Sequence, residues 1–438
     1  MSMDKPLRVV LRSPLVALLA LFACSEAPPY VAGTDTDTDT DSDADTDTDT
    51  DADAGPEFAP LYAEGSFPTF ELTIPQECID ALMVSPYEYC SGDVRYRPTD
   101  DPADDVVFEN VGIRLKGRAS FQPIDAKPGF KIKLDEYVDG QRLYGLRRIT
   151  LNNMVQDPSM VHERIGYLLF REAGVPAPLA NNARVYVNGA YYGLYLNLQT
   201  LDDEFVEHLY DPAPGNLYDI SNDAYFVDVL PEWKPYFVLE TNTDVADTSD
   251  LDALIAGVGG PDETFFEDAG LVLDWDELLA MGGVQALIGD WDGYFGARNN
   301  YKAYHELGRG RFILFPWGID QTFGITDGHP DDPLWHLSYA LDGSTSEREN
   351  GWVFLRCKAS PVCLDLYMAA VGAALDAWDS LPLEEELDFI LAQTGVAKAE
   401  DTRKPYTDDQ TAQYADAMRA FLVQRGDIVA EQLAAAGY

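Results

Sequence analysis

A hairpin signal between residues 183 and 198 constrains the fold of this chain more than any other stretch of its sequence. Two runs that alternate as strands do, 183–188 and 190–198, flank the dipeptide Asn188-Gly189. Asn-Gly supplies the positive φ angles that a tight hairpin turn needs, so the two runs are predicted to pair as antiparallel strands. The first half of the chain is therefore expected to build a sheet.

More strands and one helix are predicted around this hairpin. Alternation of apolar and polar side chains predicts strands at 66–74, 106–116, 129–137 and 147–151. A helix is expected to follow, with Asp157 as its N-cap and Pro158 at its first helical position. It should run to Glu172, because Gly174 and Pro176 stop it. The first half is thus predicted to be an antiparallel sheet with a helix packed on it.

The second half of the chain is predicted to be mostly helical. Helical periodicity covers 201–210, 274–289, 364–378, 383–392 and 408–435. A short hairpin, 299–305 with 311–316, is expected about Gly308. The acidic run 211–273, which is rich in Pro, Gly and Asn, is interpreted as an insertion or lid. Together these patterns predict an α+β fold.

The N-terminus indicates the compartment. Two arginines precede an apolar run, 15–22, which closes on Leu21-Phe22-Ala23-Cys24. The run is too short to span a bilayer comfortably and has the regions of a secretory signal. It resembles a bacterial lipoprotein signal, which predicts a signal peptide at 1–23, lipidation of Cys24, and an exported protein anchored to the bacterial membrane or cell surface by lipid alone. An ordinary signal that is cut elsewhere is the alternative.

An aspartate-rich tract follows the signal. Every second residue from Asp35 to Asp53 is an aspartate, and no side chain between 34 and 54 is apolar and larger than alanine. Such a segment cannot bury surface, so residues 24–56 are predicted to be a disordered, charged tether. Calcium binding is the alternative, but the tract lacks the glycine turn and fixed ligand positions of a calcium loop. The folded part is expected to begin near Glu57.

The net charge and the cysteines exclude some classes of partner and of site. The formal net charge of -46 at pH 7 argues against nucleic acid and against anionic membrane surfaces. Four cysteines remain after Cys24, and their two short spacings suggest the disulfides Cys78–Cys90 and Cys357–Cys363, although four cysteines permit three pairings. The chain has no C-x-x-C pair and its histidines are scattered, so the cysteines have no resemblance to a metal site.

A basic cluster stands out in this acidic chain, which holds only 30 Lys and Arg in all. Its members are Arg114, Lys116, Arg118, Lys127, Lys131, Lys133, Arg142, Arg147 and Arg148. Lysines and arginines on strands can reach phosphate oxygens, so the cluster is interpreted as a phosphate or polyanion site. The alternative is a solvated strand face that balances nearby acids.

The segment 290–324 carries the side chains of a second candidate site. It holds Asp290 and Asp292, then Asn299 and Asn300, and an apolar strand that leads to Asp320. A general base together with amide and carboxylate oxygens is what metal-assisted phosphoryl transfer needs. The alternative is that the two acids cap or follow the preceding helix and that the two amides form a turn.

Several spaced motifs resemble one family. They are 111–120 with KGRAS, 127–137 (KPGFKIKLDEY), 149–153 (ITLNN), 157–178 ending in REAGVPAP, 185–198 (VYVNGAYYGLYLNL), 290–301 and 316–324. In this order they resemble the successive motifs of the CotH kinase family, named for spore-coat protein H. The resemblance implies an atypical protein-kinase-like fold over 57–438, with an N-lobe at about 57–200 and a C-lobe at about 201–438.

The resemblance also implies an activity. Members of the family are expected to bind ATP with a divalent cation, Mg²⁺ or Mn²⁺, and to phosphorylate Ser or Thr on a partner protein. By this resemblance Asp292 is the catalytic acid/base, and Asn300 and Asp320 bind the metal.

The resemblance assigns the cofactor contacts too. Lys116, Arg118 and Lys131 are the candidates for contacts with the phosphates. Glu163, on the predicted helix, is expected to pair with a phosphate-binding lysine.

One departure from the family pattern bears on activity. The family's Pro-Trp-Asp-x-Asp reads Pro316-Trp317-Gly318-Ile319-Asp320 here, so the first acid is missing. If that acid is an essential metal ligand, the protein is weakened or inactive; if Asp320 is the ligand, activity survives. Members of the family also serve as surface adhesins or invasins, so the alternative function is a non-catalytic cell-surface binding or structural protein that reuses the fold.

Overall fold

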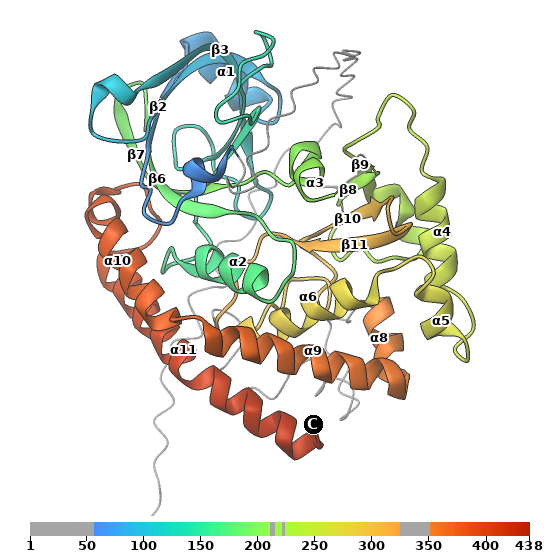
Figure 1. The fold of residues 1–438 in the computed structure, drawn as a ribbon. Coiled ribbons are helices and arrows are strands. Elements are labelled where there is room, and N and C mark those ends of the chain that lie inside the picture. The colour runs from blue at the N-terminus through green and yellow to red at the C-terminus, as the bar shows by residue number, and fades with distance from the viewer. Residues whose placement is uncertain (1–56, 211–214, 221–223, 325–350) are drawn as a thin grey trace, which may run out of the picture.

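The computed structural model describes residues 57–210, 215–220, 224–324 and 351–438. The predicted signal peptide, the lipidation site at Cys24 and the aspartate-rich tether lie outside these residues. Figure 1 shows a barrel of strands at one end of the molecule, helices at the other end, and a small sheet between them. The predicted α+β fold, with its strands first and its helices second, is confirmed.

The N-lobe is a closed barrel with strand order β1-β2-β3-β4-β5-β7-β6. Its strands are β1 (Thr69–Thr73), β2 (Cys90–Arg97), β3 (Val106–Lys116), β4 (Gly129–Lys133), β5 (Arg148–Asn152), β6 (Ala180–Val187) and β7 (Ala190–Leu198). Neighbours pair antiparallel except β1 and β6, which pair parallel and close the barrel. The strand pattern predicted an antiparallel sheet that contains the β6–β7 hairpin, but it missed β2 and this closure.

The predicted hairpin is confirmed as β6 and β7. Its turn residues have positive φ angles, 51° at Asn188 and 79° at Gly189. The Asn188 side chain accepts a hydrogen bond from the backbone N–H of Ile74 (2.8 Å) and donates one to its carbonyl (2.9 Å). The turn is thereby fixed to the end of β1, the strand that β6 pairs with.

Apolar side chains from alternate strand positions fill the barrel. Phe70, Ile113, Leu115, Phe130 and Ile132 are almost completely buried there. Outside the strands, the predicted Cys78–Cys90 disulfide joins helix α1 (Gln76–Val84) to the start of β2. Short 3-10 turns complete this lobe at η3 (Ala59–Tyr62) and η4 (Pro102–Asp104).

Helix α2 (His162–Glu172) packs beneath the barrel, but its start differs from the prediction. The prediction that Asp157 is the N-cap and Pro158 the first helical residue is wrong. Instead the Asp157 carboxylate accepts backbone N–H bonds from Ser159, Val161 and His162, each 2.8 Å long. These bonds stabilise a separate turn, so the helix begins only where the turn ends.

The C-lobe begins with a small sheet of order β11-β10-β8-β9. Its strands are β8 (Leu217–Ile220), β9 (Phe237–Leu239), β10 (Tyr301–Glu306) and β11 (Arg311–Pro316). The predicted hairpin is confirmed as β10 and β11. The interpretation of 211–273 as an insertion or lid is wrong for β8 and β9, which are integral strands of this sheet.

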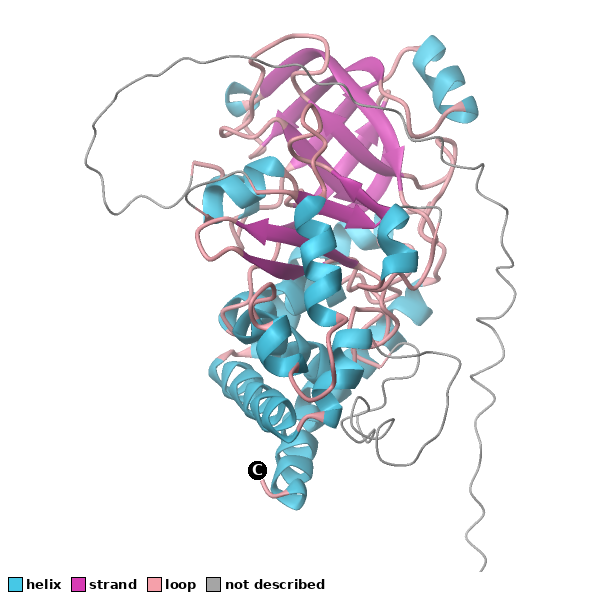
Figure 2. Cartoon of the chain, turned by 90° about the vertical axis from the view of Figure 1, so that its right-hand side faces the viewer, coloured by secondary structure: helices cyan, strands magenta, loops and turns pink. Residues whose placement is uncertain are grey.

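Helices form the rest of the C-lobe, and several of them lie below the small sheet in Figure 2. They are α3 (Asp203–Leu209), α4 (Ser249–Val258), α5 (Phe265–Ala269), α6 (Trp275–Ile288), α8 (Trp352–Ala359), α9 (Pro361–Ser380), α10 (Leu383–Glu400) and α11 (Asp408–Ala436), with a 3-10 turn η5 (Pro231–Tyr236). The predicted Cys357–Cys363 disulfide joins α8 to α9.

Helix α6 is the centre of the C-lobe core. It is buried nearly all round, and Gly283 lies so close to α9 that a Cβ there would be 2.6 Å from the carbonyl oxygen of Ala370. Among the described residues, α9 is the one helix long and apolar enough to cross a membrane by length and composition. Its side chains Tyr367 and Val371 are buried in the core with α6, which is the packing of a core helix.

Candidate functional site

A cleft of about 380 Å³ is lined by residues of the barrel and of the small sheet. Lys116 and Lys131 line it from the barrel, and Asp292, Asn300 and Asp320 line it from the C-lobe. The structure thus brings together cationic and acidic candidates that lie up to two hundred residues apart in the sequence. A cleft with cations on one wall and hard oxygen groups on the other can hold a phosphate together with a divalent cation.

Lys116 is the last residue of β3, and a chain of polar contacts connects it to Glu163. Its ammonium donates to the Asn152 amide oxygen, and the Asn152 amide nitrogen donates to both Glu163 carboxylate oxygens, at 3.1 and 2.9 Å. Burial raises the pKa of Glu163 to about 7, and the charge of Lys116 opposes that rise. The expected pairing of helix glutamate and lysine therefore runs through Asn152, and Glu163 lies behind the cleft wall.

Lys131, on β4, is the cation of the cleft with fewest partners. Burial, together with the nearby charges of Arg114 and Lys302, lowers its pKa to about 8, and the charges of Glu240 and Asp219 oppose this shift. Its ammonium has no hydrogen bond or ion pair to another residue in the part of the chain that the structure describes. A bound anion stabilises the charged form of a buried ammonium that has no such partner, so Lys131 fits the predicted contact with a phosphate.

Replacing Lys131 by Met is expected to raise the free energy of unfolding at pH 7 by roughly 1–2 kcal/mol. This is less than the full pKa shift implies, because Lys131 is only half-buried and solvent screens its charge. An exposed lysine has a pKa near 10.4, so the unfolded chain keeps a proton that the folded chain loses above about pH 8. The cost of the buried charge is thus fully present below pH 8 and disappears as the pH rises to about 10.4.

Urea unfolding of both proteins at pH 7 and pH 10 measures this effect. Lys133→Met is the matched control, because Lys133 lies on the same strand but forms an ion pair with Glu136 at 3.2 Å. A Lys131→Met protein that is less stable than the wild type at pH 7 would contradict the expectation.

Arg118 lines the cleft on the loop that follows β3. Gly117 has a φ of 106°, and a Cβ there would lie 2.8 Å from the Ser120 hydroxyl, so the tight turn requires glycine. The Arg118 guanidinium lies 3.2 Å from the centroid of the Tyr225 ring and donates to the Ala224 carbonyl. Arg118 therefore joins the two walls at the mouth of the cleft, in addition to its predicted contact with phosphate.

Arg114 also lines the cleft, but the interpretation of the whole basic cluster as a polyanion site is wrong for its five other members. Lys127 forms a buried ion pair with Asp401, and Lys133 pairs with Glu136. Arg142, Arg147 and Arg148 pair with acids at the start of α3. These charges balance nearby acids, as the alternative interpretation has it, although Lys127 is buried and precedes β4 and so is not part of a solvated strand face.

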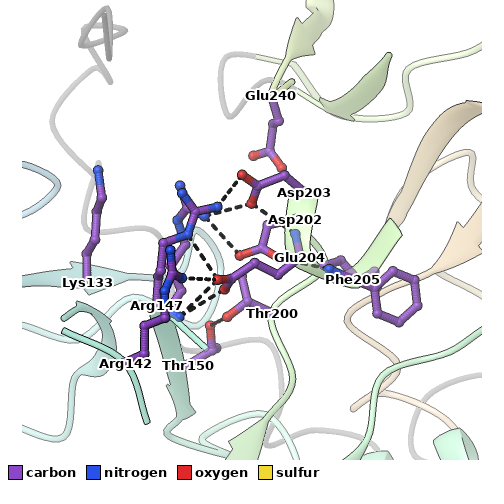
Figure 3. A network of polar contacts seen from close by, with 12 residues as sticks. Lys133, Arg142, Arg147, Thr150, Thr200, Asp202, Asp203, Glu204, Phe205 and Glu240 are labelled. Carbon is purple, nitrogen blue, oxygen red and sulfur yellow. Dashed lines mark hydrogen bonds and ion pairs between the residues drawn. The ribbon is translucent and has the colours of Figure 1, made fainter. Parts of the chain in front are cut away.

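Figure 3 shows the arginine–carboxylate network at the start of α3, where the chain passes from β7 into the C-lobe. Arg147 forms an ion pair with Glu204 at 2.9 Å, and Arg148 forms one with Asp203 at 2.8 Å. The hydroxyls of Thr150 and Thr200 lie 2.8 Å apart below them. Since Thr200 lines the cleft, the network fixes the connection between the lobes at the edge of the site.

Asp290 lies outside the cleft. Helix α6 ends at Ile288, and Gly289 follows in the left-handed region with a φ of 66°. The buried Asp290 carboxylate accepts a hydrogen bond from the Gln285 amide at 2.8 Å, and burial together with the Asp292 charge raises its pKa to about 8. Asp290 therefore follows and closes the helix, as the alternative interpretation has it.

Asp292 lines the cleft, held by both asparagines. Its carboxylate accepts hydrogen bonds from the amide nitrogens of Asn300 at 2.8 Å and Asn299 at 3.2 Å. Asn300 also donates to the Gly318 carbonyl at 3.0 Å. Both side-chain hydrogen bonds of Asn300 use its amide nitrogen, so its amide oxygen has no hydrogen bond to another described residue.

Asp320 is the second acid of the cleft. Burial raises its pKa well above the ordinary value, Glu163, Asp157 and Asp292 add to this, and Lys116 opposes it. Its carboxylate makes no hydrogen bond or ion pair to another described residue, while its backbone carbonyl lies 3.2 Å from the His162 ring nitrogen.

The chemistry of these groups is compatible with a hard divalent cation. The Asp320 carboxylate and the Asn300 amide oxygen are hard donors that make no hydrogen bond or ion pair to the residues that the structure describes. Among the described residues no group of three or more His, Cys, Asp or Glu could hold a metal by itself. Mg²⁺ is usually bound by one or two carboxylates plus the phosphates of a substrate, which matches so small a set of protein ligands.

Some residues of the cleft were not singled out from the sequence. Asn152 and Trp317 lie within the quoted motifs, but an amide and an indole carry no obvious chemistry in isolation. The Trp317 ring lies near the ammonium groups of Lys116 (5.9 Å) and Lys302 (6.0 Å). Lys302 also pairs with Asp219 at 3.1 Å, and this pairing depends on β8, which was not predicted.

The family model described as CotH kinase protein matches residues 113–427. The chain belongs to the CotH kinase family. The match begins within β3, so β1, α1 and β2 lie outside the range matched by the family although they complete the barrel.

Curated CotH relatives cover part of the chain. Inner spore coat protein H of Bacillus subtilis (strain 168) is 27% identical over 187 residues, 41% of this chain and 51% of the relative. Invasin CotH2 of Rhizopus delemar is 23% identical over 245 residues, 51% of this chain and 39% of the relative. The matches thus span about half or less of the length of these relatives.

Two of the solved structures that align with this chain are a kinase and a chain from a toxin–antitoxin complex. The Helicobacter pylori proinflammatory kinase CtkA aligns at 10% identity over 70% of this chain and 95% of that chain, with a TM-score of 0.33. A chain of the Shewanella oneidensis MR-1 complex of HipA, HipB and operator DNA aligns at 12% identity over 71% of this chain and 61% of that chain, with a TM-score of 0.29.

Proposed function

We propose that this CotH family member is an atypical protein kinase that transfers the γ-phosphate of ATP to Ser or Thr of a partner protein with the help of Mg²⁺ or Mn²⁺. The observation that carries the proposal is the cleft itself. Lys116 and Lys131 on one wall face Asp292, Asn300 and Asp320 on the other. Phosphoryl transfer depends mainly on positioning and on neutralising phosphate charge, and this arrangement supplies both.

Asp292 is the proposed general base. Its carboxylate is held by two asparagine amides at the cleft wall, which fixes its direction toward an incoming hydroxyl. The hydroxyl oxygen forms the new bond to the γ-phosphorus, the bond from that phosphorus to ADP breaks, and the hydroxyl proton passes to Asp292.

The cations and the metal ligands stabilise the phosphates. Lys116 and Lys131 contact phosphate oxygens as point charges. Asp320 and Asn300 would hold the divalent cation, which supplies further neutralisation of phosphate charge when it is bound. Glu163 acts through Asn152 to orient Lys116.

We also propose that the protein is exported and anchored by lipid at Cys24. Its relatives include an inner spore coat protein and invasins. The two disulfides fit an oxidising compartment, and the N-terminal sequence resembles a lipoprotein signal. The partner is expected to be a Ser/Thr-rich or surface protein of the same compartment.

The second candidate function is a non-catalytic surface binding or structural protein, and Gly318 is the observation that favours it. This residue stands where the family pattern has an acid, and it has a φ of 55°. A Cβ there would lie 3.0 Å from Cγ and 3.1 Å from the amide oxygen of Asn300. The backbone at this position has therefore adapted to glycine.

Labelled ATP distinguishes the two functions. The purified protein is incubated with labelled ATP, Mg²⁺ or Mn²⁺, and Ser/Thr-rich acceptor proteins, and transfer is measured on the acceptor. We expect transfer that depends on the metal. Absence of transfer, together with absence of an increase in melting temperature with ATP and metal, would support the non-catalytic function.

Restoring the family acid by Gly318→Asp is expected to lower stability by about 1 kcal/mol, because a side chain at a positive φ is strained. The new side chain would also press on Asn300, so the rate of transfer should fall rather than rise. Gly318→Ala is the control for backbone strain alone. Urea unfolding and the transfer rate are the measurements, and a faster Gly318→Asp enzyme would show that the missing acid limits activity.

A further inference from the structure

The connection between α10 and α11, residues 401–407, reaches the barrel and makes a buried ion pair there. The ammonium of Lys127 lies 2.6 Å from the Asp401 carboxylate, and the two side chains are 1% and 0% exposed. The same carboxylate accepts backbone N–H bonds from Leu194 at 3.1 Å and Arg403 at 2.9 Å. Gly193 leaves the room for it, since a Cβ there would collide with the carboxylate.

Arg403 extends this contact along the loop between β3 and β4, residues 117–128. Its guanidinium donates to the carbonyls of Asp125 at 2.7 Å and Ala126 at 2.6 Å. It also lies 3.9 Å from the centroid of the Tyr192 ring, and the Tyr192 hydroxyl donates to the Ile124 carbonyl at 3.0 Å. The far half of the loop is thus bound by residues from the C-terminal end of the chain.

The near half of the same loop lines the cleft with Gly117, Arg118 and Ser120. The side chain of Asn153 connects the two halves, because its amide nitrogen donates to the carbonyls of Ser120 and Lys127, each at 2.9 Å. One side chain therefore holds both halves of the loop.

The connection also contacts the segment that leads into α2. The Tyr406 hydroxyl donates to the Val155 carbonyl at 2.6 Å. This segment carries the Asp157 turn, after which α2 presents Glu163 toward Lys116. Residues 401–407 thus contact both parts of the N-lobe that position Lys116 and the loop 117–128.

We infer that the α10–α11 connection is a brace that positions the loop 117–128 for ATP, with Arg403 and Asp401 as positioning residues; this rests on the proposed function. Burying an ion pair costs desolvation energy, so such a pair is poorly explained by stability alone. What it provides here is a fixed geometry for a loop that has no regular secondary structure of its own.

Arg403 is the best position for a test. Removing Lys127 or Asp401 would leave an uncompensated buried charge and could unfold the protein. Arg403 is partly exposed, so Arg403→Met removes the contacts with the loop and leaves the ion pair intact. The matched control is Arg419→Met on α11, where Arg419 pairs with Asp388 of α10.

The first measurement is ATP affinity in the presence of Mg²⁺, by calorimetry on the full chain, well below the unfolding temperature of each variant. We expect Arg403→Met to raise both the Kd and the KM for ATP about tenfold, the typical effect of losing one charged hydrogen-bonding group, with kcat changed less than twofold. Arg419→Met should bind as the wild type does. Equal affinity in Arg403→Met and wild type, or an equal loss in the control, would overturn the inference.

The second measurement separates the brace from the proposed function. Amide hydrogen exchange without nucleotide should become faster across 117–128 in Arg403→Met and stay unchanged in Arg419→Met. Unchanged exchange in Arg403→Met overturns the brace. If the wild type binds no ATP but the exchange of the loop rises in Arg403→Met, the brace stands and the proposed function fails.

Discussion

Asp292→Asn is expected to lower kcat for phosphoryl transfer about 10²–10⁴-fold, the range for loss of a general base. The asparagine keeps the shape of the side chain and its place beside Asn299 and Asn300, but it cannot take the proton of the acceptor hydroxyl. Because Asp292 is not a proposed ligand of the metal or of ATP, the Kd for ATP with Mg²⁺ should change little. Steady-state kinetics and calorimetry on the same preparation measure both effects.

The matched control for this prediction is Asp290→Asn, two residues away. Its carboxyl is buried outside the cleft with a pKa of about 8, so it is already mostly protonated at pH 7 and an amide replaces it with little electrostatic change. We expect this variant to transfer phosphate at nearly the wild-type rate. Similar losses in both variants would mean that Asp292 acts through local folding and not through chemistry.

Asp320→Asn is expected to remove the stabilisation that ATP and Mg²⁺ confer on the wild type. A ligand at about a hundred times its Kd adds roughly 2.7 kcal/mol to the free energy of unfolding if its site works. Without the Asp320 carboxylate the metal loses its charged protein ligand, so the increase in melting temperature and the transfer of phosphate should disappear together.

Asp292→Asn serves as the control for this second prediction, since it should lose transfer but keep the ATP-induced increase in melting temperature. ATP without metal is the further control, because a true metal ligand affects only the metal-dependent part of binding. If Asp320→Asn kept the full increase in melting temperature with ATP and metal, Asp320 would be excluded as the metal ligand. The acid that is missing at Gly318 would then have no substitute at position 320.

Local signals in the sequence were sufficient for most of the antiparallel elements. The turn at Asn188-Gly189 and the alternation on either side of it specify a hairpin without reference to distant residues. The parallel pairing of β1 with β6 has no such signal, because the two strands are more than a hundred residues apart and contact each other only in the closed barrel. The start of α2 was predicted wrongly, because Asp157 caps a separate turn. In sequence, such a turn looks the same as a helix N-cap.

The candidate site was predictable to the extent that its residues match a family motif. Asp292, Asn300 and Asp320 lie together in the cleft, as the resemblance implied. The sequence could not show which residues of the basic cluster line the cleft and which form ion pairs, since the partners Asp401 and Glu204 lie far along the chain. The contact of Lys116 with Glu163 through Asn152 could not be predicted either. It depends on how β5 and α2 lie relative to each other, which the sequence does not show.

The closed barrel has a consequence for anyone who prepares a shorter protein. A fragment limited to the range matched by the family would begin at residue 113 and lose β1 and β2. Strands β3 and β6 would then become open edges with unpaired N–H and C=O groups, which are templates for edge-to-edge aggregation. Insolubility of such a fragment would reflect the opened barrel, and a soluble fragment should begin no later than Glu57.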